Sequence, residues 1–225
     1  MRRLGKLVYC GLIIILVGII GYISTWASYN YVWPILMMIG LVILIIGAIF
    51  TGITNKRLMI GGILGLSSIL LTIAFPNLLN WYRIEYIEEV SGFIFGLYIT
   101  GFGSAYIIGT VPIVISLILL ELFGGILILT GSIGCIFSAI KESRVIGIIG
   151  GILILLVPII FTIDLFLGLG FFIQLITSLG AGSFRGTLFY GMMRYSGAIL
   201  TWGVGVGFYI CLASGIIVLS SARTI

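Results

Sequence analysis

Glu121 and Asp164 have the greatest potential for chemistry in this chain, because each carboxylate borders a long apolar segment. An acidic side chain at the centre of a lipid bilayer costs on the order of 3 kcal/mol, so such residues usually bind protons or ligands. Glu121 stands twenty residues before Lys141, and Asp164 stands twenty residues after Arg144. Twenty helical residues span about 30 Å. This distance predicts that both carboxylates lie at the outer membrane interface, solvated or ion-paired; a proton or ligand site is the alternative.

Three basic residues, Arg83, Arg185 and Arg194, form a second group of candidates. They stand among aromatic residues that include Trp81 and Tyr82. Arginine stacks on aromatic rings and pairs bidentately with carboxylates. These residues therefore predict either a contact surface for a partner subunit, a lipid headgroup or an anionic ligand, or internal ion pairs that hold the outer segments together. We favour the internal pairs.

The residue types present argue against catalysis and metal binding. The chain has no histidine, which is the commonest metal ligand and general base. Its three cysteines, Cys10, Cys135 and Cys211, are far apart and form no CxxC motif. We therefore predict no catalytic residues, no cofactor and no metal site, and a protein that is not an enzyme.

The composition is that of a membrane protein. Of 225 residues, 61% are hydrophobic and 8% are charged, and the mean hydropathy is +1.39. Soluble proteins carry about 25% charged residues. The 33 glycines suit helices packed closely in lipid. We expect one transmembrane domain over residues 1–225 and no nucleic-acid partner.

A membrane-spanning helix needs about 20 mainly apolar residues. On this basis the sequence predicts an all-α fold with six helices, at residues 7–26, 31–53, 58–79, 113–140, 145–163 and 197–220. They form three tandem hairpins in the same orientation, over residues 1–54, 55–141 and 142–225.

The charges indicate the orientation of these hairpins. The predicted inner side has eight basic residues and one acidic residue, a net charge of +7; the outer side has three basic and five acidic residues, a net charge of −2. This asymmetry follows the positive-inside rule. We predict an integral protein of the cell membrane with both termini in the cytoplasm. The inner residues are Arg2, Arg3, Lys6, Lys56, Arg57, Lys141, Glu142, Arg144 and Arg223.

The outer connectors of the second and third hairpins are long and apolar, at residues 80–112 and 164–196. Their cores, 91–108 and 165–184, are long enough to span a membrane. A span at 91–108 would move Lys141 and Arg144 to the outer side and destroy the charge asymmetry. We therefore expect both cores to be re-entrant or to lie at the interface, helical or covered by protein.

The hairpins also carry a resemblance to a known family. The segment GGILGLSSILLTIAFP, from Gly61 to Pro76, is similar to the hairpin unit of HdeD-type bacterial acid-resistance membrane proteins. The resemblance implies six spans in three similar hairpins and assigns no functional residue. The long outer connectors differ from the short ones of that family.

These observations lead to two functional hypotheses. The first is a non-enzymatic subunit of a larger membrane assembly, which contacts other subunits, further copies of itself or membrane lipids through its outer aromatic and arginine residues. The alternative is a transporter of a small solute or lipid that uses Glu121 and Asp164. Transporters and channels usually have polar groups near the membrane midplane, and this sequence offers few.

Overall fold

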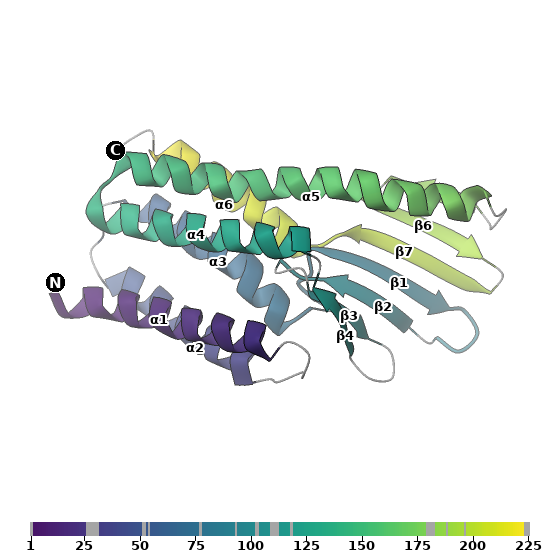
Figure 1. The fold of residues 1–225 in the computed structure, drawn as a ribbon, viewed down its shortest axis with the longest axis horizontal. Helices are drawn as coiled ribbons and strands as arrows, with labels where there is room; N and C mark the ends of the chain where they lie inside the picture. The colour runs from purple at the N-terminus through teal and green to yellow at the C-terminus, as the bar shows by residue number, and fades with distance from the viewer. Residues whose placement is uncertain are drawn as a thin grey trace.

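The computed structural model describes most of the chain. The described residues are 2–25, 32–50, 53, 55–76, 78–92, 94–101, 104–108, 113–117, 119–178, 183–187, 189–195 and 197–222. Within them the chain forms six helices and one seven-stranded sheet. The helices lie at one end of the molecule and the sheet at the other (Figure 1).

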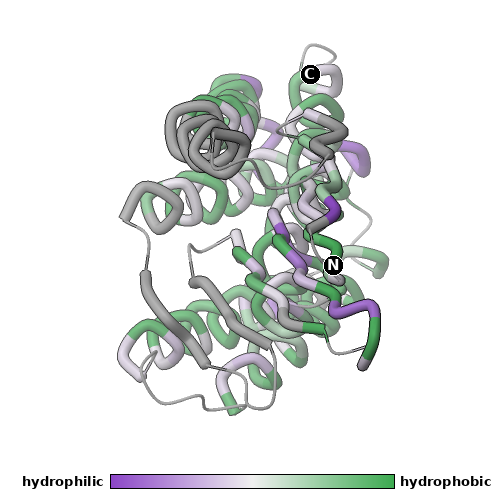
Figure 2. The backbone as a smooth tube through the Cα atoms, turned by 90° about the vertical axis from the view of Figure 1, so that its right-hand side faces the viewer, coloured by the Kyte–Doolittle hydropathy of each residue, from purple (hydrophilic) through white to green (hydrophobic). Residues whose placement is uncertain are grey.

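All six predicted helices are present within the described residues. They are α1 (Arg2–Ser24), α2 (Val32–Phe50), α3 (Lys56–Ala74), α4 (Leu119–Lys141), α5 (Arg144–Ser178) and α6 (Val206–Ala222). The first five are long and apolar enough to cross a membrane, and α6 is a shorter apolar helix of 17 residues. Viewed from the sheet end, the described helices are largely hydrophobic along their length (Figure 2). The fold is thus compatible with a helical bundle embedded in a membrane.

Four of the helices form a ring, in which α3 contacts α4, α4 contacts α5, α5 contacts α6, and α6 contacts α3. Helices α1 and α2 form a separate hairpin whose α2 contacts α3. Both ends of the chain lie at the end of the bundle away from the sheet (Figure 1). We call this the basic end, because Lys56, Lys141 and Arg144 are all found at helix termini there.

Local signals in the sequence explain where helices begin and turn at the basic end. The backbone N–H of Leu58 donates to the side chain of Asn55 at 3.0 Å, which caps the start of α3. Between α4 and α5, Glu142 adopts a φ of 55°, and the Ser138 hydroxyl donates to the carbonyl oxygen of Ser143 at 2.6 Å. The tight turn makes α4 and α5 antiparallel neighbours.

The outer connectors fold into a β-sheet, which corrects the prediction of an all-α fold. Its order is β4-β3-β2-β1-β7-β6-β5, and all neighbouring strands are antiparallel. The strands are β1 (Tyr82–Glu88), β2 (Ile94–Ile99), β3 (Ser104–Ile108), β4 (Ile113–Leu117), β5 (Ser183–Gly186), β6 (Tyr190–Tyr195) and β7 (Ala198–Val204).

Within residues 91–108 the structure describes the strands β2 and β3, so the helical form of this prediction is wrong. The re-entrant or interfacial position of the segment stays a prediction. Open strand edges are not tolerated in lipid, so a membrane-inserted chain would hold this sheet outside the hydrocarbon region. In the second core, residues 165–178 are helical, which was one of the expected alternatives, and they extend α5 beyond its predicted end at 163; the strand β5 begins at Ser183.

Three predicted helices are shorter in the structure than expected. Residues 113–117 belong to β4, so α4 begins at Leu119 rather than at 113. Residues 198–204 belong to β7, so α6 begins at Val206 rather than at 197. Helix α3 ends at Ala74, shortly before Pro76, instead of at 79. Helices α4 and α6 are thus shortened where their apolar sequence belongs to the sheet, whereas α3 ends before a proline.

Helix α5 connects the two parts of the molecule. Its 35 residues extend about 52 Å, whereas a span takes about 20 residues. The excess of about 15 residues, or about 22 Å, matches the roughly 23 Å length of the seven-residue strand β1. Helix α5 thus continues past the other helices along the sheet (Figure 1).

Candidate partner interface

The two faces of the sheet have different residues, and strand β1 shows this most clearly. Tyr82 is fully buried and Ile84 is partly buried, whereas the alternate residues Arg83 and Glu85 point to the opposite face. Successive side chains of a strand lie on opposite faces of the sheet. We call the face with Tyr82 and Ile84 the covered face, and the face with Arg83 and Glu85 the open face.

The covered face continues the hydrophobic core of the helices. Ile84 lies opposite Trp202 of β7, and Leu200 of β7 lies opposite Met193 of β6. Trp202 and Met193 are buried in the same cluster as the helical core. The ring of Tyr82 lies 6.4 Å from that of Phe161 in α5. Packing against the bundle therefore occupies this face.

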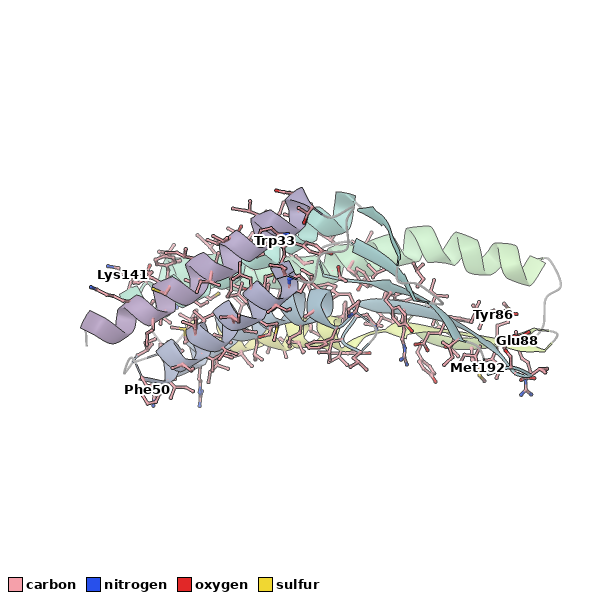
Figure 3. All side chains as sticks on the ribbon, turned by 90° about the horizontal axis from the view of Figure 1, so that it is seen from below. Trp33, Phe50, Tyr86, Glu88, Lys141 and Met192 are labelled. Carbon is pink, nitrogen blue, oxygen red and sulfur yellow. The ribbon has the colours of Figure 1, made fainter. Side chains whose placement is uncertain are left out.

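The open face carries large apolar side chains that nothing in the described chain covers. Tyr190 is 69% exposed, Ile94 is 52% exposed and Met192 is 42% exposed. The cations of Arg83 and Arg194 lie on the same face, as the strand register shows. Met192 and Glu88 both lie toward the tip of the sheet, far from Lys141 at the basic end (Figure 3).

Glu85 is the centre of a polar cluster on the open face. The Tyr98 hydroxyl donates to Glu85 Oε1 at 3.0 Å, and the Thr201 hydroxyl donates to Glu85 Oε2 at 3.5 Å. Arg83 Nη1 lies 3.8 Å from Glu85 Oε1. These contacts join β1, β2 and β7 across the sheet.

A second ion pair holds the tip of the sheet. Arg194 in β6 contacts Glu89 Oε1 through Nη2 at 2.7 Å and donates a hydrogen bond from Nε at 2.8 Å. Both side chains are partly exposed, so the pair is worth about 1 kcal/mol or less. Arg83 and Arg194 thus show the internal pairing that we favoured from the sequence, and both remain partly exposed on the open face.

The environment of Tyr98 predicts a loss of stability at high pH. Burial, followed by the hydrogen bond to Glu85 and its negative charge, raises the pKa of Tyr98 to about 12. Because its pKa in the unfolded chain is about 10, the stabilisation is complete below pH 10 and is lost as the pH rises toward 12. Thermal midpoints measured from pH 9 to 12 should fall less steeply in Tyr98→Phe than in wild type. The exposed Tyr190→Phe is the control; equal slopes in all three proteins would contradict the prediction.

Trp81 and Tyr82, which the sequence suggested as surface contacts, are buried instead. Trp81 is 2% exposed and Tyr82 is fully buried, and burial raises the pKa of Tyr82. The Trp81 Nε1–H donates to the carbonyl oxygen of Ser68 in α3 at 2.9 Å. Its ring lies edge-on to Phe161 and Phe208. Trp81 therefore joins the sheet to the bundle and is not available to a partner.

The structure places Glu121 and Asp164 in adjacent helices. Glu121 lies near the start of α4 and Asp164 lies within α5. Gly124 packs near Val157, and Gly131 packs near Gly150. This antiparallel alignment puts the two acidic residues within about one helical turn of the same level. Their side chains lie outside the part of the chain whose surroundings are described, as does that of Arg185, which pairs in register with Met192.

Most of the described polar groups of the helix ring are hydrogen-bonded, and the buried hydroxyl of Ser132 in α4 is an exception. The Ser214 hydroxyl of α6 donates to the carbonyl oxygen of Gly61 in α3 at 2.7 Å. The Gly101 N–H donates to the Thr72 hydroxyl at 3.1 Å, which ties the sheet to α3. Among the described residues, no group of three or more Cys, Asp or Glu side chains is placed to hold a metal ion.

Sequence reasoning identified Arg83 and Arg194 but missed the exposed Ile94 and Met192. Register alone brings these four residues to one face. Met192 is exposed and Met193 is buried, but both are methionine, so the sequence YGMMRY of β6 does not reveal the alternation. No model of a known protein family matches the chain, and no curated protein matches it.

Proposed function

We propose that the chain is a non-enzymatic membrane protein, an accessory subunit of a larger assembly, whose sheet stands outside the bilayer and contacts a partner protein through its open face. The apolar helices support the membrane location, and the positive charge of the basic end supports a cytoplasmic position for both termini. The proposal leaves the resemblance to HdeD-type proteins at the level of hairpin architecture.

The observation that carries this proposal is the set of exposed apolar side chains on the open face, Tyr190 and Met192 in β6 and Ile94 in β2, on the same face as the cations of Arg83 and Arg194. Protein interfaces are enriched in Tyr, Met and Arg. The covered face is less suited to a partner, because its residues Trp202 and Met193 already pack in the core of the bundle.

Adjacent methionines provide a matched test. Met192 is exposed on the open face, whereas Met193 is 5% exposed on the covered face. Each is replaced in turn by the photoreactive residue p-benzoylphenylalanine in the native host. Irradiation should give a covalent adduct of higher mass at position 192 and only intramolecular products at position 193.

A second, differently tagged copy of the chain distinguishes self-association from binding to another subunit. Mass spectrometry of the adduct then identifies the partner. Absence of a protein adduct at position 192, or equal adducts at both positions, would contradict the proposed interface.

The transporter alternative is supported only by the position of Glu121 and Asp164, which lie within about one helical turn of the same height along the adjacent helices α4 and α5. The few polar groups inside the ring argue against it, since the Ser214 hydroxyl is bonded to α3 and the hydroxyls of Ser68 and Thr72 are bonded within α3. An uptake rate that is lost in Glu121→Gln at normal expression would favour transport, and an unchanged rate would exclude it.

A further inference from the structure

An apolar groove lies between α2 and the sheet end of α3. Its volume is about 650 Å³, within the range of about 300–1,000 Å³ typical of small-molecule sites. Pro34, Met38 and Val42 of α2 line one side, and Ala74 and Phe75 line the other. None of the lining residues has a polar side chain.

The groove is accessible from the outside of the bundle. Val42 is 51% exposed and Phe75 is 44% exposed. The α1–α2 hairpin touches the ring through α2 and α3, and the ring of Tyr9 in α1 lies 5.8 Å from Phe137 of α4 near the basic end. The groove lies at the other end of the same hairpin, beside Pro34 and Phe75.

The depth of the groove indicates what fills it. Along α2 it extends from Pro34 to Ile43, about 14 Å of helix. The hydrocarbon core of a bilayer is about 30 Å thick, so the groove spans about one leaflet. A single acyl chain of a phospholipid enters from one interface and ends near the midplane, a depth that matches the length of this groove.

We infer that this groove binds an acyl chain of a phospholipid from the outer leaflet, with the headgroup beyond Pro34 and Phe75. The inference rests on the proposed membrane insertion of the bundle. It adds a lipid site that is separate from the open face of the sheet. The apolar lining selects for the chain and not for the headgroup.

The test compares two alanines of spanning helices. Ala74 lines the groove, whereas Ala213 of α6 is exposed elsewhere on the bundle. The full chain is purified in mild detergent, incubated with dioleoylphosphatidylcholine and examined by native mass spectrometry. Ala74→Trp should bind the lipid about tenfold more weakly than wild type, the loss expected when about two methylene groups are no longer buried. Ala213→Trp should bind like wild type.

Val42→Trp, at the deep end of the groove, provides a second variant and should also weaken binding. Thermal melting of each variant verifies that it is folded. Equal lipid binding by Ala74→Trp and Ala213→Trp would overturn the inference, as would a dimer in place of the lipid adduct. If alkaline carbonate extracted wild type from membranes, the proposed membrane insertion would be wrong. This outcome can be distinguished from a groove that does not bind lipid.

Discussion

Trp81→Ala should lower the free energy of unfolding by about 3–5 kcal/mol, the cost of removing a large buried aromatic side chain. Trp81 is 2% exposed and stands directly before β1 at the joint between the bundle and the sheet. Its ring contacts Phe161 of α5 at 5.5 Å and Phe208 of α6 at 6.1 Å between centroids. The variant would therefore leave a cavity where three elements meet.

The loss should be visible as a thermal midpoint roughly 10 °C lower than that of wild type, measured by scanning fluorimetry in mild detergent. Helices α5 and α6 would no longer be fixed against the start of β1. We expect the sheet to become sensitive to protease at a lower temperature than the helices. A midpoint within about 2 °C of wild type would contradict the assigned role of Trp81.

Two phenylalanine variants separate the hydrogen bond from the packing. Trp81→Phe removes the bond from Nε1 to the Ser68 carbonyl and should cost about 1 kcal/mol beyond the lost volume. Trp33, which contacts Gly21 of α1, is the matched control, because its buried Nε1 has no hydrogen-bond partner among the described residues. Trp33→Phe should therefore be less destabilising than Trp81→Phe. The reverse order would show that the Trp81 hydrogen bond contributes nothing.

The helical part of this fold could be predicted from the sequence because its signal is local and long. Long apolar runs allow few alternatives: α3 has 19 residues and begins at Lys56, α4 has 23 residues and ends at Lys141, and α5 begins at Arg144. The same residues predicted that all three hairpins share one orientation. The structure agrees, since both chain ends lie at the basic end. The cellular side of that end stays a prediction.

The sheet could not be predicted with the same ease, although strand β1 carried a signal. Arg83 and Glu85 alternate with Ile84 and Tyr86, the period of a strand with one buried face. Strands β2 and β4 lack this alternation, because IFGLYI and IVISL are almost entirely apolar. Short apolar runs of this kind fit helix and strand equally well.

The candidate interface depends on contacts between distant parts of the sequence. Arg194 meets Glu89 across 105 residues, and Glu85 meets Thr201 across 116. Composition indicated that arginine and aromatic residues would gather outside the membrane. Only the pairing of β1 with β7 determines that Tyr82 is buried and that Met192 is exposed. The sequence alone contains no local feature that specifies this register.

Gly131→Ala should separate α4 from α5, with a loss of about 1–3 kcal/mol in the free energy of unfolding. A Cβ atom at Gly131 would lie 2.7 Å from the carbonyl oxygen of Gly150. The contact is reciprocal, because a Cβ at Gly150 would lie 2.6 Å from the carbonyl oxygen of Gly131. Backbone atoms cannot move aside as a flexible side chain can, so the helices themselves must shift.

Gly134 in the same helix is the matched control, since a Cβ there would meet only Ile146 Cγ2, at 3.7 Å. Gly134→Ala should be neutral or stabilising by up to about 1 kcal/mol, because alanine favours helix over glycine. Thermal midpoints of the two variants should therefore move in opposite directions from wild type, or Gly131→Ala alone should fall. Equal midpoints would contradict the close contact. The expected contrast shows why glycine recurs along these helices: Gly47, Gly131 and Gly215 each lie where a neighbouring helix approaches closely, against Val8, Gly150 and Leu155.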